Sequence, residues 1–403
     1  MGWEKFGIFF ALFILLFFAL GLGYIVVRES NSSSVEKVPI TGFNNLSRRF
    51  DDLMVSIMEN HDVPGGSLAV AKDNNLVLNR GYGWADRNRN VPVKLDSLFR
   101  IASLTKPITA VTVLHLWEEG RLSLRAKAFR LLDNLEPPAG RQISDPRIYD
   151  ITVLDLLRHR AGWRRLMDPM FMPIRIAENL GVSPPADSRD IIRYMLTQPL
   201  DYSPGENFFY SNFGYNVLGR VIEVVTGRKY ENYVKNEVLE SMGITDMRIG
   251  NSLLEKQGEN EVFYHSSREV FSVFPPHNLV PQAYGGLYLQ AMDSHGGWVG
   301  SASDVVEFMT SIDDFLEENT IKFMTSPPAS VENFADRYYG CGWYIYRNDN
   351  RRDWVHTGGL PGSCGVMVRT HDGFALTALF NKYPPSLSPF QTYEKFLETS
   401  ENI

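Results

Sequence analysis

One serine and one lysine stand at a spacing that can support nucleophilic catalysis. Ser103 and Lys106 are three residues apart, so a helix that begins at Ser103 places both side chains on one face, one turn apart. A serine hydroxyl is a weak nucleophile until a base removes its proton or a neighbouring cation lowers its pKa. A buried lysine can do either, because burial disfavours the charged ammonium form. The pair therefore predicts a nucleophilic serine with a lysine partner.

The same spacing also arises at ordinary helix starts, where the serine caps the helix and the lysine is solvated. Ser34 and Lys37 repeat it, but they lie in a polar run without an apolar period, so we assign them no role. The apolar residues after Ser103 recur at spacings of three and four: Leu104, Ile108, Val111, Leu114 and Trp117. This period predicts a helix with one apolar face, and Gly120 marks its end.

The elements that position this pair are strands at both ends of the chain and helices in the middle. A helix is predicted at 49–61, and the pattern is mostly helical from about 107 to 295. Strands are predicted at 66–71, 76–84, 338–346, 354–357, 365–370 and 374–380, with a last helix at 389–399. Strands that enclose a helical middle indicate one sheet split by an insertion.

Composition describes a globular protein that does not bind nucleic acid. The chain has 403 residues, 44% of them hydrophobic, and a net charge of −7, so no basic stripe can track phosphates. Two cysteines, Cys341 and Cys364, exclude a disulfide-dense scaffold and a four-cysteine zinc site. They could form one disulfide in an oxidising compartment or remain two buried thiols. No metal-ligand pattern is visible, and the sequence implies no cofactor.

The N-terminus predicts a membrane anchor. Residues 6–27 are an unbroken run of apolar or glycine residues that ends at Arg28, long enough to cross a bilayer and longer than the core of most signal peptides. We therefore predict a cytosolic tail at 1–5 and a transmembrane signal-anchor at 6–27. The small residues around Ala19 leave cleavage and secretion as the alternative.

Charges around this run are balanced, so they do not orient it. Asn31 and Asn45 each begin an N-glycosylation sequon in the polar segment 28–47, which we interpret as a linker. Both would lie where a lumenal or extracellular stalk is expected. The sequence thus favours a single-pass type II membrane protein whose bulk lies outside the cytosol.

Three motifs follow one another in the chain. They are Ser103-x-x-Lys106, then Tyr210-Ser211-Asn212 after a Pro204-Gly205-Glu206 turn, and then His356-Thr357-Gly358. In order and spacing the set resembles the serine β-lactamase and penicillin-binding protein superfamily, over roughly residues 48–395. With Tyr-x-Asn as the second motif, it is most similar to the class C branch, which includes family VIII esterases, D-aminopeptidases and animal β-lactamase-like proteins.

The resemblance implies a role for each motif residue. Ser103 would attack a carbonyl carbon and become acylated. Tyr210, as a phenolate stabilised by nearby cations, would accept the serine proton, and Lys106 would hold the phenolate and share that proton. Asn212 would orient the substrate or the lysine. The main-chain N–H groups of Ser103 and of Gly359, on an edge strand, would form the oxyanion hole.

The third motif departs from the β-lactamase pattern. His356 stands where β-lactamases carry a lysine, and Thr357, Gly358 and Gly359 follow it as substrate-binding residues. A lysine is a permanent cation suited to a substrate carboxylate, whereas a histidine is charged only part of the time near neutral pH. Histidine here resembles D-amino-acid peptidases and esterase-like members and lowers the expectation of efficient β-lactam turnover. His159 reads as a packing residue.

The sequence therefore predicts an α/β (α+β) protein of the β-lactamase/transpeptidase-like fold. An antiparallel sheet flanked by helices, with an all-helical lobe inserted at about 107–295, would form a catalytic domain at 48–400. The expected activity is hydrolysis of an amide or ester in a small molecule or peptide through an acyl-enzyme. Two alternatives stay open: a scaffold that keeps the fold without turnover, and a DD-peptidase-type penicillin-binding protein.

Overall fold

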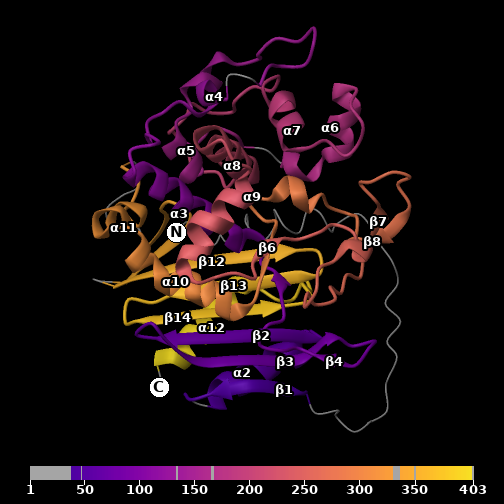
Figure 1. Ribbon diagram of the computed structural model, residues 1–403, viewed down its shortest axis with the longest axis vertical. Coiled ribbons are helices and arrows are strands. Elements are labelled where there is room, and N and C mark those ends of the chain that lie inside the picture. Colours follow the sequence, from indigo (N-terminus) through magenta and orange to yellow (C-terminus); the bar gives the residue numbers. More distant parts are fainter. Residues whose placement is uncertain are drawn as a thin grey trace, which may run out of the picture. The chain divides into compact units, whose positions relative to one another are not determined.

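The centre of the fold is a sheet built from both ends of the chain. The computed structural model describes residues 38–46, 48–132, 135–164, 168–329, 336–348 and 351–401. Within them, antiparallel strands run in the order β1-β3-β2-β14-β13-β12-β11-β10, with β4 beside β3. Figure 1 shows the indigo N-terminal strands next to the yellow C-terminal ones. Their bounds are β1 (Ile40–Asn44), β2 (Gly65–Lys72), β3 (Asn75–Asp86), β4 (Val91–Pro92), β10 (Arg337–Tyr339), β11 (Tyr344–Asn348), β12 (Arg351–Leu360), β13 (Ser363–Arg369) and β14 (Phe374–Phe380).

Smaller strand pairs lie outside this sheet. A three-stranded sheet has the order β5-β9-β6, and β7 and β8 form a separate two-stranded hairpin. The bounds are β5 (Phe99–Arg100), β6 (Arg248–Ile249), β7 (Glu269–Phe271), β8 (Leu279–Pro281) and β9 (Trp298–Gly300). β5 matters most for function, because it leads directly into the turn that holds Ser103.

Helices cover the sheet and fill the middle of the chain. Their bounds are α2 (Arg48–Asn60), α3 (Thr105–Glu118), α4 (Ala128–Leu131), α5 (Val153–Leu157), α6 (Pro173–Leu180), α7 (Ser188–Met195), α8 (Asn212–Thr226), α9 (Tyr230–Tyr233), α10 (Ala302–Phe315), α11 (Glu318–Met324) and α12 (Pro389–Glu401). The short turns are η1 (Ala102–Leu104), η2 (Pro146–Asp150), η3 (Pro169–Phe171), η4 (Val234–Leu239), η5 (Glu240–Met242), η6 (Leu254–Lys256) and η7 (Leu289–Met292).

Strand β2 shows why the sheet lies between two helical layers. Leu68 and Val70 point to the face covered by α2 and α12, where Phe50 stacks on Phe396 with ring centroids 6.3 Å apart. The intervening alanines point to the opposite face, which α10 covers. Alternation along a strand thus places apolar side chains on both faces, as a sheet buried on both sides requires.

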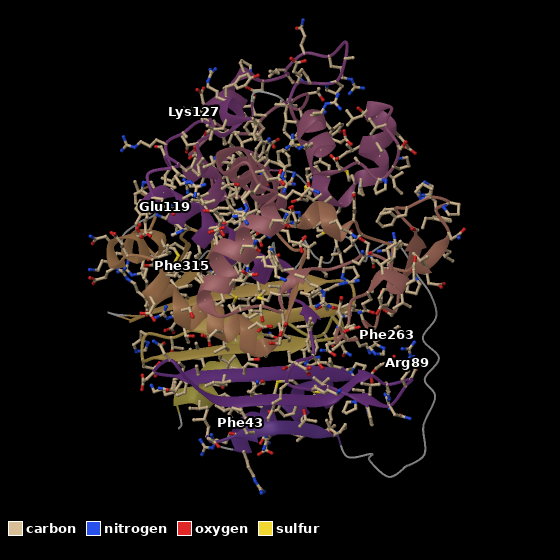
Figure 2. The ribbon with its side chains drawn as sticks, viewed as in Figure 1. Phe43, Arg89, Glu119, Lys127, Phe263 and Phe315 are labelled. Atoms are coloured by element: carbon tan, nitrogen blue, oxygen red, sulfur yellow. The ribbon has the colours of Figure 1, made fainter. Side chains whose placement is uncertain are left out.

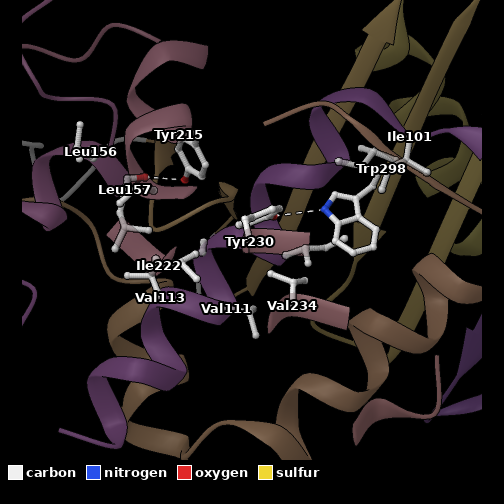
Figure 3. Close-up of a cluster of buried hydrophobic side chains, with 14 of the residues drawn as sticks. Ile101, Val111, Val113, Leu156, Leu157, Tyr215, Ile222, Tyr230, Val234 and Trp298 are labelled. Carbon is white, nitrogen blue, oxygen red and sulfur yellow. Dashed lines mark hydrogen bonds between the residues drawn. The ribbon is translucent and has the colours of Figure 1, made fainter. Parts of the chain in front are cut away.

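Helix α3 is buried on nearly all sides. The sequence predicts one apolar face, but almost every residue of α3 up to Leu116 is buried, because α8 and the neighbouring turns surround the helix. Figure 3 shows this core, in which Tyr215 donates a 2.9 Å hydrogen bond to the carbonyl of Leu157 and Trp298 donates one of 3.3 Å to Tyr230. A helix packed on all sides holds its first turn rigidly against the sheet.

Three predicted segments differ from the structure. The end of the predicted linker, Ile40–Asn44, forms strand β1 on β3; an edge strand is held by main-chain hydrogen bonds, so its partly exposed side chains give no apolar alternation. The predicted all-helical lobe, at about 107–295, contains β6, β7 and β8 in its last part. The predicted strand 338–346 is divided into β10 and β11 by a turn at Gly342, where φ is +87°.

The predicted anchor at 6–27 and the sequon residue Asn31 lie outside the described residues. In the part of the chain that the structure describes, no helix is long and apolar enough to cross a membrane. Asn45 lies in an exposed bend after β1. Cys341 and Cys364 are both buried free thiols, so the second of the two alternatives for the cysteines is the one found.

Candidate active site

Ser103 lies in a tight turn, η1, between strand β5 and helix α3. Ala102 before it has a φ of +50°, in the left-handed region that residues other than glycine rarely adopt. The hydroxyl of Ser363 in β13 donates a 2.5 Å hydrogen bond to the carbonyl of Arg100, so the large sheet holds the strand that enters the turn. No side chain caps α3. The Ser103 hydroxyl is therefore not an ordinary helix cap, and its side chain is partly exposed.

Lys106 is completely buried beneath this serine. Its Nζ lies 3.1 Å from Ser103 Oγ, 2.7 Å from Asn212 Oδ1 and 2.8 Å from the main-chain carbonyl oxygen of His295. It also lies 4.7 Å from the ring centroid of Tyr210. Three segments, 103–106, 210–212 and the main chain at His295, thus converge on one nitrogen, and the serine and lysine side chains meet as their spacing predicts.

The surroundings of Lys106 favour its uncharged form. Burial holds the pKa of Lys106 well below its ordinary value, and the nearby carboxylate of Asp168 raises it only in part. The side-chain oxygen of Asn212 and the carbonyl of His295 can only accept hydrogen bonds. Two N–H bonds of a neutral amine satisfy both acceptors, which leaves the nitrogen lone pair for the third neighbour, the Ser103 hydroxyl. Such an amine can accept a proton.

Asp168 fixes the orientation of Asn212. Its Oδ2 accepts a 3.0 Å hydrogen bond from the main-chain N–H of Asn212, and its Oδ1 accepts one from the N–H of Met170. A further side-chain hydrogen bond joins Asp168 to Asn212, so the amide nitrogen of Asn212 faces the carboxylate and its oxygen faces Lys106. Burial raises the pKa of Asp168, and these hydrogen bonds and Lys106 lower it again.

Tyr210 covers the serine and lysine from the side of α8. Burial raises the pKa of its phenol well above the ordinary value, and Tyr344 adds to this, whereas a hydrogen bond with the Ser103 side chain lowers it. The predicted phenolate is therefore opposed by the surroundings of the ring, because burial favours the neutral phenol. In its resting form Tyr210 can donate a proton rather than accept one.

His159 packs against Tyr210 and Tyr339. Its ring centroid lies 4.3 Å from that of Tyr210 and 4.6 Å from that of Tyr339, and its Nδ1 accepts a 3.1 Å hydrogen bond from the main-chain N–H of Ser211. Burial lowers the pKa of His159 well below its ordinary value. These contacts agree with its interpretation as a packing residue.

His356 is buried behind the site and does not face solvent. Only 1% of it is exposed, and its ring centroid lies 6.2 Å from that of Tyr210. Nδ1 lies 2.9 Å from the carbonyl oxygen of Thr357, and Nε2 lies 3.2 Å from the hydroxyl of Tyr339. Burial and the nearby Lys106 lower the pKa of His356 to about 3. The ring is therefore neutral at physiological pH.

Strand β12 brings its glycines against the nucleophile turn. It lies between β13 and β11 and is not a complete edge strand, but β11 pairs only with Arg351–Val355. The part of β12 that carries the third motif therefore has one uncovered edge. A side chain at Gly358 would lie 2.5 Å from the carbonyl oxygen of Ile101 and 3.1 Å from the main-chain nitrogen of Ser103, and one at Gly359 would collide with the ring of Tyr383.

Comparison with known proteins identifies the chain. Residues 50–397 match the model of the family described as Beta-lactamase. The chain belongs to this family. Its membership places it among the hydrolases of the β-lactamase type. A penicillin-binding protein from Bacillus subtilis is 27% identical over 335 residues, which are 81% of this chain and 70% of that protein.

Two solved structures share the fold of this Beta-lactamase family member. The D-amino acid amidase from Ochrobactrum anthropi in complex with D-phenylalanine has a TM-score of 0.67 at 22% identity and covers 88% of this chain and 99% of its own. EstCE1, a hydrolase with promiscuous acyltransferase activity, has a TM-score of 0.67 at 18% identity and covers 86% and 97%. At these identities the likeness supports the fold alone.

Three residues that complete the site of this Beta-lactamase family member, Asp168, His295 and Tyr339, were not predicted from the sequence. Asp168 stands before a proline in a connecting segment, where an aspartate usually signals a turn or a helix cap. His295 contributes its main-chain carbonyl, so its side-chain type gave no signal. Tyr339 ends strand β10, and its contact with His356 depends on the fold. Among the described residues, no cluster of His, Cys, Asp and Glu side chains could hold a metal ion.

Proposed function

We propose that the protein is a membrane-anchored serine hydrolase that cleaves an amide or ester through an acyl-enzyme on Ser103, with Lys106 and Tyr210 transferring the protons. One observation carries the proposal: the fully buried Lys106 nitrogen lies 3.1 Å from the partly exposed Ser103 hydroxyl. Its other two hydrogen-bond partners are pure acceptors, Asn212 Oδ1 and the His295 carbonyl. A solvated lysine on a helix surface would not be held in this way.

In the acylation step, Ser103 Oγ attacks the carbonyl carbon of the substrate while its proton moves to the neutral amine of Lys106. The carbonyl oxygen becomes an oxyanion, which the main-chain N–H groups of Ser103 and Gly359 would stabilise. When the bond to the leaving group breaks, its nitrogen or oxygen takes a proton from the Tyr210 phenol. Lys106 then returns a proton to Tyr210, and the acyl group remains on Ser103.

In the deacylation step, a water molecule attacks the ester carbonyl of the acyl-enzyme and gives its proton to the same amine. The Ser103 oxygen leaves as the alkoxide and takes that proton back from Lys106. The acid product departs, and both residues return to their starting forms. Lys106 therefore serves as the base in both halves of the cycle. Its two fixed hydrogen-bond acceptors hold the amine in the same position for both steps.

The third motif favours substrates without a carboxylate beside the scissile bond. His356 is buried and neutral, and both of its ring nitrogens are engaged within the protein by Thr357 and Tyr339. It therefore offers no positive charge to an anion. Esters and amides with neutral flanks fit better than β-lactams or peptides with a free C-terminal carboxylate. The amidase and the hydrolase that share the fold are in keeping with this substrate class.

The apolar run at 6–27 supports a single-pass type II orientation with the catalytic domain lumenal or extracellular. The sequons at Asn31 and Asn45 support the same side, and Asn45 is exposed. Secretion after cleavage is the alternative. Carbonate extraction of membranes and a mobility shift on glycosidase treatment test the anchor and the orientation together; a soluble chain without glycans would contradict both.

The decisive experiment on the chemistry is intact mass spectrometry of the full chain after exposure to a fluorophosphonate, a penicillin and an aryl ester in turn. An adduct that maps to Ser103, and is lost in Ser103→Ala, is expected with the fluorophosphonate and the aryl ester. A stable penicillin adduct would favour the penicillin-binding-protein alternative. A folded chain that no reagent labels would favour the scaffold alternative and contradict the proposal.

A further inference from the structure

The hairpin β7–β8 carries the two most exposed large apolar side chains among the described residues. Phe271 is 70% exposed and Leu279 is 57% exposed, and they stand directly opposite each other in the antiparallel pair. Large apolar side chains that gather on a projecting element usually mark a contact surface. Figure 1 shows the hairpin projecting at one side of the described chain.

Charge in the hairpin is confined to its base, where exposed Arg268 and Glu269 stand at the start of β7. From Val270 to Met292 there is no Asp, Glu, Lys or Arg. Between the two strands, Pro275 and Pro276 are exposed as well. A protein partner that recognised this tip would find few groups to pair with by charge, whereas the boundary region of a lipid bilayer accepts apolar side chains without specific partners.

The segment that leads into the hairpin contacts the same end of β3 as the start of the described chain. The carbonyl of Pro39 accepts a 2.8 Å hydrogen bond from the N–H of Gly83, near the end of β3. Two residues further on, the carbonyl of Ala85 accepts a 2.8 Å hydrogen bond from the N–H of Phe263, in the segment that leads into β7. Figure 2 shows Phe263 close to Arg89, which lies in the turn that follows this end of β3.

The length of the segment 28–37 limits the distance between the predicted anchor and this end of β3. Ten residues, 28–37, separate the apolar run from Val38. Even fully extended they span at most about 35 Å. The anchored chain therefore keeps this end of β3 within about 35 Å of the bilayer surface. A bilayer then lies within reach of the hairpin, which favours it over other occupants of the exposed tip.

We propose that the tip of the β7–β8 hairpin inserts Phe271 and Leu279 into the surface of the lipid bilayer. The inference rests on the anchor at 6–27 in the proposed function. The inserted hairpin fixes the orientation of the catalytic domain on the membrane. It also joins the site to the membrane through one stretch of chain, because the carbonyl of Ala283 is bound by Arg100 and that of His295 is bound by Lys106.

The test places a fluorophore at the tip of the hairpin in the full chain. Phe271→Cys is labelled with an environment-sensitive dye, and the native cysteines, which are buried, do not compete. The matched control is Leu76→Cys, because Leu76 is 40% exposed and is the second residue of β3, at the opposite end from Ala85. With phosphatidylcholine vesicles that carry nitroxide-labelled headgroups, we expect at least about tenfold stronger quenching at position 271 than at position 76.

Each outcome decides the proposal. Adding Leu279→Ser to the labelled chain is expected to reduce quenching at position 271 severalfold, whereas adding Leu76→Ser is expected to leave it unchanged. Equal quenching at the two labelled positions, or none at position 271, would overturn the inference. So would a blue shift at position 271 that grows with protein concentration without vesicles, which would identify a second copy as the occupant.

The anchor is measured separately, by flotation of the unlabelled chain with its membranes. A chain that does not float contradicts the anchor in the proposed function. The labelled chain is then mixed with added vesicles, and quenching at position 271 still decides whether the hairpin enters lipid. Failure of the anchor and failure of the hairpin are thus distinguishable.

Discussion

The neutral state of His356 makes the stability of the protein depend on pH. In the folded chain its pKa is about 3, whereas in the unfolded chain it is near the ordinary value of about 6.5. As the pH falls below about 6.5, the unfolded chain binds a proton that the folded chain does not. The unfolding free energy therefore decreases as pH falls, and this loss continues until the folded pKa is reached. Above about pH 7.5 the contribution is complete.

The size of the effect follows from these two pKa values. Between pH 8 and pH 5 the linkage relation gives a loss of about 2 kcal/mol in unfolding free energy from His356 alone. Burial also holds His159 and His295 neutral. Their contributions to the unfolding free energy therefore also decrease as the pH falls. The contribution of His356 must therefore be isolated by comparison with a variant that lacks only this ring.

His356→Gln provides that comparison, because its amide oxygen can accept the hydrogen bond of the Tyr339 hydroxyl. Urea unfolding of the full chain in detergent is measured at pH 8 and pH 5 for both proteins. The wild type is expected to lose about 2 kcal/mol more than the variant over this interval, while the other histidines cancel. An equal loss in both proteins would mean that His356 binds a proton as readily in the folded chain as in the unfolded one, and would refute the burial-enforced neutrality on which the substrate preference rests.

Three further changes probe the proton path and the turn. Tyr210→Phe is expected to slow acylation by an aryl ester by roughly two to four orders of magnitude in stopped-flow measurements; an unchanged rate would remove this phenol from the mechanism. The acylation rate should rise with pH as Lys106 loses its proton, at a pH set by its lowered pKa. Asp168→Asn removes a carboxylate that raises this pKa, so the rise in rate should move to lower pH. A move to higher pH would contradict the assignment of the base. Gly358→Ala is expected to abolish labelling by a fluorophosphonate, because its Cβ would collide with the nucleophile turn, whereas Gly214→Ala, which meets only ordinary contacts, should label normally.

The side chains of the candidate site were predictable because their types and order carry the signal. Ser103, Lys106 and Asn212 meet in the structure with Tyr210 beside them, as the three motifs indicate. The strands buried on both faces were also predictable, since apolar runs with turn residues at their ends specify them. Residues 65–72 and 75–86 lie within a few residues of the predicted bounds.

The rest depends on contacts that no local pattern encodes. Strand β1 is held by main-chain hydrogen bonds to β3, and these bonds leave no mark on the side chains of Ile40–Asn44. The neutral state of His356 requires its burial under Tyr339, which only the assembled sheet provides. Likewise, the phenol of Tyr210 is neutral because neighbouring side chains exclude water from it. A sequence motif gives the residue type at this position but not its exposure to water.

The pairing of β2 with β14 has a consequence for how the protein is made. Leu68 is paired with Ala378, so one edge of the central strand stays open while nearly the whole chain leaves the ribosome. At roughly 5–20 residues per second, the roughly 300 residues between these partners take on the order of 15–60 s to synthesise. During that time the early strands present an unpaired, apolar edge that other chains can join. Gly358, which packs against the nucleophile turn, is also synthesised late, with the last strands. The site around the turn is therefore incomplete in a nascent chain, and the enzyme is inactive until its synthesis is nearly finished.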